Sequence, residues 1–172
     1  MKNNQQIFGN GVEAEGFLLL EDLRPLELIM GKPAAEFVIE EVVRKHPGLR
    51  GSFTLEQASP MMEINTGVHP DFATAIDEIF EKKTLLNAVA ARHGARLVFT
   101  PVPPKPFRFI AASSDPTSHS FKLVEEWSKA VDGDEQLLAT ATASVQFNTS
   151  TPFQGKNQRQ RWEIARLVHN KL

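Results

Sequence analysis

Hydrophobic residues occur along this chain mainly in short runs that are separated by glycine, proline and charged residues. Runs of this kind, rich in valine, isoleucine, threonine and phenylalanine, predict β-strands. A Ser-Pro pair at residues 59–60 separates two of these runs. The pattern predicts strands at residues 12–20, 51–57, 61–66, 95–100 and 140–147.

Elsewhere the apolar residues recur at the spacing of an amphipathic helix. Pro47 and Gly48 follow the first such segment, and Gly94 is placed to end the second in a left-handed conformation. The last helical segment is basic, and we expect its apolar face to pack on the sheet rather than to contact a membrane or RNA. Helices are predicted at residues 34–45, 70–92, 119–131 and 157–172.

These elements predict an α+β fold, because strands and helices are interspersed without the regular alternation of a parallel α/β sheet. A largely antiparallel, curved sheet with helices on its outer face is expected. The chain has 172 residues, which is enough for one hydrophobic core, and it contains no internal repeat or linker-like segment. We therefore expect a single domain over residues 1–172.

The composition narrows the classes of function. A formal net charge of −2 gives no indication of nucleic-acid or membrane binding. The absence of cysteine excludes disulfides, thiolate zinc sites and a cysteine nucleophile. No apolar run approaches the length of a membrane span, and no apolar signal-peptide segment follows the polar N-terminal residues, so a cytoplasmic protein is expected.

Two segments carry pairs of polar residues on alternate positions of an expected strand. Glu13 and Glu15 form the first pair, and Gln146 and Asn148 form the second. Alternate residues of a strand point to the same face, so each pair shares one face. Neighbouring carboxylates repel each other and are costly to bury unless a cation lies between them. Hard oxygen ligands of this kind suit Mg²⁺ or Mn²⁺.

A second acidic pair, Glu56 and Glu63, flanks the Ser-Pro break. Their odd spacing would place the two carboxylates on opposite faces of an unbroken strand. A bulge or turn at the break would restore a common face. For any single glutamate the simpler alternative is a solvated charge at a strand edge, but a Glu-x-Glu pair on an apolar strand is less easily explained in this way.

Other motifs give no competing site. The five histidines lack the spacing of metal ligands, and the chain contains neither a Gly-x-Ser-x-Gly motif nor a Gly-Lys-Ser/Thr motif. Gly9-Asn10-Gly11 precedes a strand instead of following one, which does not fit a dinucleotide-binding loop. No catalytic acid, base or nucleophile can be named from the residues.

Three segments resemble one known family. Gly-Val-Glu-Ala-Glu at residues 11–15, leading into an apolar strand, resembles the opening of the glutamate–cysteine ligases and related carboxylate–amine ligases. Glu56 and Glu63 resemble the second acidic segment of the plant and proteobacterial type. Ala-Thr-Ala-Ser-Val-Gln-Phe-Asn at residues 141–148 resembles its later Thr-Val-Gln-Val-Asn strand. The segments occur in the order of the family, across residues 9–150.

The resemblance implies a fold like that of the catalytic domain of glutamine synthetase, of which this chain would be the N-terminal half. It implies that Glu13, Glu15, Glu56 and Glu63 bind Mg²⁺ ions that hold the phosphates of ATP. It also implies that Gln146 and Asn148 line the region of the nucleotide and of the glutamate substrate. The implied reaction phosphorylates a carboxylate, and an amine then displaces the phosphate.

The sequence also departs from this family. The enzymes are roughly twice this length, and their later half supplies a further metal-binding glutamate and phosphate-binding arginines. Gly16 is an extra residue relative to the common Glu-x-Glu-Phe pattern. The sequence is therefore compatible with a fragment, with one chain of a split enzyme or with an inactive relative. Expected partners are an amino acid or amine substrate and either a second chain or a further copy that completes the site. The alternatives are a non-catalytic ligand-binding or regulatory protein on the same half-fold and a purely structural α+β domain.

Overall fold

The computed structural model describes residues 9–105, 107, 110–118, 122, 126 and 143–149. In this part of the chain, helices and antiparallel strands form a mixed α+β fold. None of the helices described here combines the length and the apolar character that crossing a bilayer requires.

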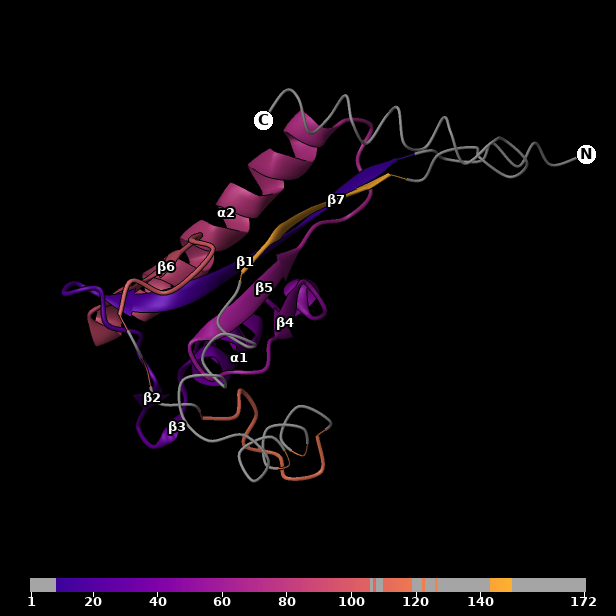
Figure 1. Cartoon of the computed structure of the whole chain (residues 1–172). Coiled ribbons are helices and arrows are strands. Elements are labelled where there is room, and N and C mark those ends of the chain that lie inside the picture. Colours follow the sequence, from indigo (N-terminus) through magenta and orange to yellow (C-terminus); the bar gives the residue numbers. More distant parts are fainter. Residues whose placement is uncertain are drawn as a thin grey trace, which may run out of the picture.

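The main sheet is organised around β1 (Asn10–Leu20), its longest strand. On one side of β1 lies β5 (Met61–Asn65), followed by β4 (Phe53–Leu55). The other side is shared by two strands from distant parts of the chain, as Figure 1 shows. There β7 (Val145–Thr149) pairs with the first half of β1, and β6 (Ala95–Val98) pairs with the second half. All these pairs are antiparallel.

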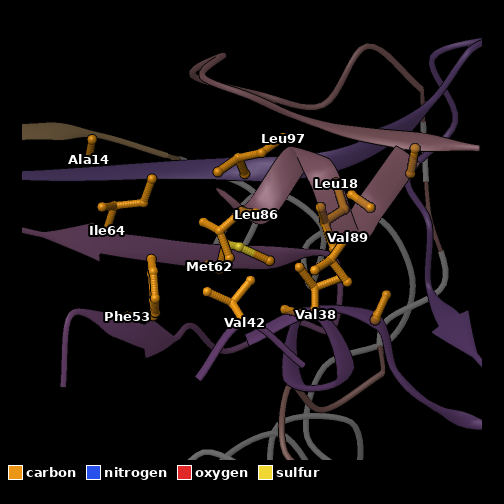
Figure 2. Packing of buried hydrophobic residues seen from close by; sticks show 14 of the residues in the cluster. Ala14, Leu18, Val38, Val42, Phe53, Met62, Ile64, Leu86, Val89 and Leu97 are labelled. Carbon is orange, nitrogen blue, oxygen red and sulfur yellow. The ribbon is translucent and has the colours of Figure 1, made fainter. Parts of the chain in front are cut away.

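Two helices cover one face of this sheet. They are α1 (Ala34–Lys45) and α2 (Phe72–Ala90), each continued by a short 3₁₀ turn, η1 (Pro47–Leu49) and η2 (Ala91–His93). Their buried residues meet alternate side chains of β1 and β5 in the main hydrophobic core. Figure 2 shows this packing, with ten of the core residues labelled: Ala14, Leu18, Val38, Val42, Phe53, Met62, Ile64, Leu86, Val89 and Leu97.

The opposite face of the sheet is divided along β1. Towards the C-terminal end of the strand, Phe17 and Leu19 are fully buried in a second, smaller cluster with Met61 and Phe107. Towards the N-terminal end, the same face carries Glu13 and Glu15, which are only partly buried. One strand therefore presents an apolar surface at one end and a carboxylate-bearing surface at the other.

The helix predicted at residues 34–45 is confirmed as α1, and the longer one is confirmed in the main, as α2 and η2. Gly94 ends the second segment with a positive φ of 71°, as its position predicted. The predicted strand at 51–57 is shorter in the structure, because the chain turns after Leu55. The helices predicted at 119–131 and 157–172 fall outside the described residues, apart from two helical positions at 122 and 126.

A small hairpin was not expected from the sequence. β2 (Leu28–Ile29) and β3 (Lys32–Pro33) pair with each other through a turn at Met30 and Gly31, both of which have positive φ. The polypeptide passes directly from this hairpin into α1. Strands of two residues carry no hydrophobic period, so no sequence pattern could have revealed them.

Candidate metal centre

The strand register brings two predicted acidic residues together. Glu15 of β1 lies directly opposite Glu63 of β5. Directly opposed residues of an antiparallel pair point to the same face, with their Cβ atoms about 5 Å apart. This face is the one that α1 and α2 leave uncovered, because the alternate residues Ala14 and Ile64 fill the main core instead.

Glu56 reaches the same face through a turn. β4 pairs with β5 so that Thr54 lies opposite Glu63, and Glu56 lies two positions beyond Thr54. The chain then reverses at Ser59 and Pro60, so that the odd spacing between Glu56 and Glu63 spans a hairpin instead of a single strand. The turn therefore places Glu56 and Glu63 on the same face of the sheet, as the Ser-Pro break in the sequence allowed.

Glu15, Glu56 and Glu63 form one carboxylate cluster. A carboxylate oxygen of each lies within 4.8 Å of one from each of the other two, and all three side chains are partly buried. Burial and the negative charges of Glu15 and Glu63 together raise the pKa of Glu56 to about 7. At neutral pH, Glu56 is therefore protonated for part of the time, whereas a glutamate exposed to water would be ionised.

Ser144, the residue directly before β7, fixes the position of Glu15. The backbone N–H of Ser144 donates to Oε2 of Glu15 at 2.7 Å, and the N–H of Glu15 donates to the carbonyl of Ser144 at 2.9 Å. This pair of bonds joins residues 129 positions apart in the chain. The contact was not foreseen, because a backbone donor leaves no signal in the sequence.

Glu13 lies outside the cluster. The register places it opposite Gln146, and its Oε1 accepts a hydrogen bond of 2.9 Å from Nδ2 of Asn148. Glu13, Gln146 and Asn148 all lie on the carboxylate-bearing face, as the two alternating patterns predicted. Among the described residues, however, only Glu15, Glu56 and Glu63 come close enough together to share one ion.

The donor set fits a hard divalent cation. Three carboxylates supply only oxygen ligands, which Mg²⁺ and Mn²⁺ prefer, and Mg²⁺ usually keeps further positions for water or phosphate. No lysine or arginine of the described segments forms an ion pair with any of the three carboxylates. A bound cation would balance the negative charge of this cluster.

Comparisons of the chain with protein-family models, with curated proteins and with solved structures found no significant match. The resemblance to the carboxylate–amine ligases therefore rests on the three quoted segments alone.

Proposed function

We propose that this protein is an ATP- and Mg²⁺-dependent carboxylate–amine ligase of the glutamate–cysteine ligase type, built on half of a glutamine synthetase-like domain. Glu15, Glu56 and Glu63 would hold Mg²⁺ or Mn²⁺. The observation that supports the proposal is that these three carboxylates meet although they come from β1, from β5 and from the turn after β4. The same residues carry the resemblance to the ligase family.

The chemistry of the cluster agrees with this role. A bound divalent ion supplies charge neutralisation at the phosphates of a nucleotide, which is the main electrostatic need of phosphoryl transfer. The carboxylates of the cluster would hold the ion, and the backbone of Ser144 orients Glu15. Gln146 is exposed on the same face beside Glu13, from where its amide could contact the nucleotide or the acid substrate.

A second function, non-catalytic ligand binding on the same half-fold, is favoured by one observation. The described residues provide three carboxylates but no lysine or arginine paired with them. A phosphoryl-transfer site needs cationic groups as well as metal ions to stabilise the transition state. A protein that only binds a metal ion or a metal–nucleotide complex does not.

Thermal unfolding with added MgCl₂, MnCl₂ or Mg-ATP tests the metal centre. A ligand that binds only the folded state stabilises it by about 2.7 kcal/mol at a concentration of 100 times Kd. We expect the melting temperature of the wild type to rise with metal, and that of Glu15→Gln and Glu63→Gln to rise much less. Glu21→Gln, an exposed residue just beyond β1, is the matched control and should respond like the wild type.

The variants also separate metal binding from simple repulsion. Without metal, Glu63→Gln should be at least as stable as the wild type, because one of the repelling charges is gone. With metal, the order should reverse. If metal leaves the wild type unchanged, or raises Glu15→Gln and Glu63→Gln as much as the wild type, the metal centre is wrong and the structural alternative remains.

A further inference from the structure

A pocket of about 380 Å³ opens beside the carboxylate cluster, at the N-terminal end of β1. Its volume falls within the range of small-molecule sites. The pocket is formed where the first residues of β1, the segment after β5 and β7 meet. It is lined by Gly9, Gly11, Val12, Glu13, Thr66, Gly67, Val68 and Asn148. The three-carboxylate cluster contributes none of these residues.

Glu13 is the charged group of this pocket. Its carboxylate accepts one hydrogen bond from Asn148, and no lysine or arginine of the described segments pairs with it. A carboxylate has about four acceptor positions, so Glu13 keeps most of its capacity. Asn148 donates through Nδ2, which leaves its Oδ1 as a second acceptor next to Glu13. Both groups therefore offer acceptors to a ligand that carries donors.

The remaining polar group is already satisfied. Oγ1 of Thr66 accepts a hydrogen bond from the N–H of Val12 at 2.8 Å and donates to the carbonyl of Gly67 at 3.0 Å. The other walls are the backbone of Val12 and of three glycines and the side chain of Val68, because the side chain of Val12 is buried in the main core on the other face of the sheet. The pocket thus combines one acceptor-rich, negatively charged corner with walls that suit a short aliphatic group.

The wall opposite β1 is held in place by α2. Glu78 accepts a hydrogen bond from the N–H of Gly67 at 3.0 Å and contacts the ring of His69. The backbone of His69 is in turn bonded to Asn10 in both directions, at 2.7 and 2.8 Å. A pocket whose walls are tied together in this way is formed before a ligand arrives, which lowers the entropic cost of binding.

We propose that this pocket binds a small aliphatic primary amine, with its ammonium group at Glu13 and Asn148 and its carbon chain against Val68 and the glycine backbone of the pocket. An ammonium group offers three hydrogen-bond donors and a positive charge, which match the acceptors and the charge of this corner. An anion would meet the charge of Glu13, and a neutral alcohol would lack the ionic contribution. The assignment does not depend on a metal ion at Glu15, Glu56 and Glu63.

NMR titration of the complete chain tests this proposal. Isobutylamine is the probe, and isobutanol and isobutyrate are its neutral and anionic counterparts of similar shape. Metal-free phosphate buffer avoids both competing amines and the metal centre. We expect saturable shifts of the amide signals of Gly11 and Gly67 with isobutylamine. Binding of isobutanol should be at least tenfold weaker, because hydrogen bonds to charged groups contribute more than neutral ones.

Two variants remove the site in different ways. Glu13→Gln removes the charge and should weaken isobutylamine binding by a factor of ten or more. Gly11→Val fills the pocket from a strand position. A Cβ at Gly11 would meet nothing closer than 3.6 Å, so the strand has room for the first side-chain carbon, and the amide spectrum shows whether the variant is folded. Glu15→Gln is the matched control, since it removes a charge from the same face outside the pocket, and it should retain binding.

The outcomes separate this proposal from that of the metal centre. Loss of binding in Glu13→Gln and in Gly11→Val, with folded amide spectra and retention in Glu15→Gln, supports the amine site. Equal binding of isobutylamine and isobutanol, an equal loss in Glu15→Gln, or no saturable shift at all would overturn it. Because metal is absent throughout, none of these results changes the expected response to Mg²⁺.

Discussion

The pKa of Glu56 is set by the groups that surround its side chain. It ionises less readily than an ordinary glutamate because it is partly buried and faces Glu15 and Glu63, so its pKa rises from 4.5 to about 7. The folded state therefore binds the proton of Glu56 more tightly than the unfolded state does. By linkage, this contribution to stability is fully present below about pH 4.5 and is lost as the pH rises to about 7.

The first prediction follows from this sign. In metal-free buffer, the part of the stability that depends on Glu56 should fall between pH 4.5 and 7, and Glu56→Gln should remove that fall. Urea unfolding of both proteins at half-unit pH steps measures the difference. Glu13→Gln, outside the cluster, should keep the slope of the wild type. A slope that is unchanged in Glu56→Gln would show that the three carboxylates do not interact as the structure places them.

Gly16 illustrates a residue that is required by packing. A Cβ on Gly16 would lie 2.8 Å from the carbonyl oxygen of Val98 and 3.0 Å from side-chain atoms of Leu97 and Phe99. β6 could not keep its place beside β1 with a side chain there. The residue that departs from the Glu-x-Glu-Phe pattern of the ligases is therefore explained locally, by the close approach of β6.

The second prediction tests this packing. Gly16→Ala should destabilise the protein by about 1–3 kcal/mol, the usual cost of overpacking a core. Gly48→Ala is the control, because a Cβ there meets nothing within 4 Å. It should leave the free energy of unfolding within about 0.5 kcal/mol of the wild type, as surface substitutions do. Chemical denaturation gives both values, and equal stabilities of the two variants would contradict the close approach of β6.

The helix α1 begins without a capping side chain of its own. Its N-cap is Pro33, which makes no side-chain hydrogen bond. Ser59 supplies the cap from the β4–β5 turn: its Oγ accepts from the N–H of Ala34 at 2.9 Å, and its carbonyl accepts from Ala35 at 2.9 Å. The same hydroxyl donates to the carbonyl of Glu27. The turn that positions Glu56 is thus anchored on a helix.

The third prediction concerns this anchor. Ser59→Ala should destabilise the protein by about 1 kcal/mol, because it removes the two hydrogen bonds of a fully buried hydroxyl and leaves the N–H of Ala34 and the carbonyl of Glu27 with their mutual bond of 3.1 Å. Ser52→Ala, which removes a hydroxyl with no hydrogen bond among the described residues, should change stability by less than about 0.5 kcal/mol. Denaturant midpoints measure both. If Ser59→Ala matches Ser52→Ala, the hydroxyl does not cap α1.

α2 is joined to the segment after β5 by charged groups. Lys82 is only 5% exposed, and its Nζ donates to the carbonyl of Asn65 at 2.5 Å and pairs with Glu78 at 2.7 Å. Burial opposes the ionisation of Glu78, but hydrogen bonds from Lys82, His69 and the backbone of Gly67 outweigh it and lower the pKa of Glu78. This network holds one wall of the Glu13 pocket.

The fourth prediction follows from the burial of Lys82. Glu78→Gln should destabilise the protein by about 1–3 kcal/mol, since it removes the charge that is paired with the buried Lys82, although Glu78 itself is only partly buried. Glu81→Gln, an exposed position of the same helix, is the control and should be nearly neutral. The same unfolding experiments compare the two variants. A neutral Glu78→Gln would show that Lys82 is stabilised mainly by the carbonyl of Asn65.

Over the whole molecule, the sequence predicted those features that local pattern determines. Alternation located Glu13, Glu15, Gln146 and Asn148 on shared faces, and helical periodicity located α1 and α2. It could not predict which acids meet. That depends on strand register and on a hairpin turn, which pair Glu15 with Glu63, bring Glu56 beside them and leave Glu13 with Asn148.

Two contacts between distant segments of the chain correspond to no pattern in the sequence. The pairing of both β6 and β7 with the same side of β1 joins segments far apart in the chain. The cap that Ser59 gives to α1 is likewise a contact between distant segments. Tertiary contacts of this kind are decided by the packing of the complete chain, and single-sequence patterns carry no information about them.

The last prediction concerns the chain as an enzyme. If the proposed ligase function is correct, the isolated 172-residue chain should bind metal and nucleotide but release little ADP from ATP with glutamate and a panel of amines. The reason is electrostatic: within the described residues, no cationic side chain is paired with the three carboxylates of the proposed metal centre. The loss of one preorganised group that stabilises transition-state charge can cost about 10³-fold in rate. A coupled ADP assay on the purified chain, with Glu15→Gln as the metal-deficient control, measures this. Turnover of about 1 s⁻¹ or faster in the wild type, lost in Glu15→Gln, would show that this chain alone supplies a complete site.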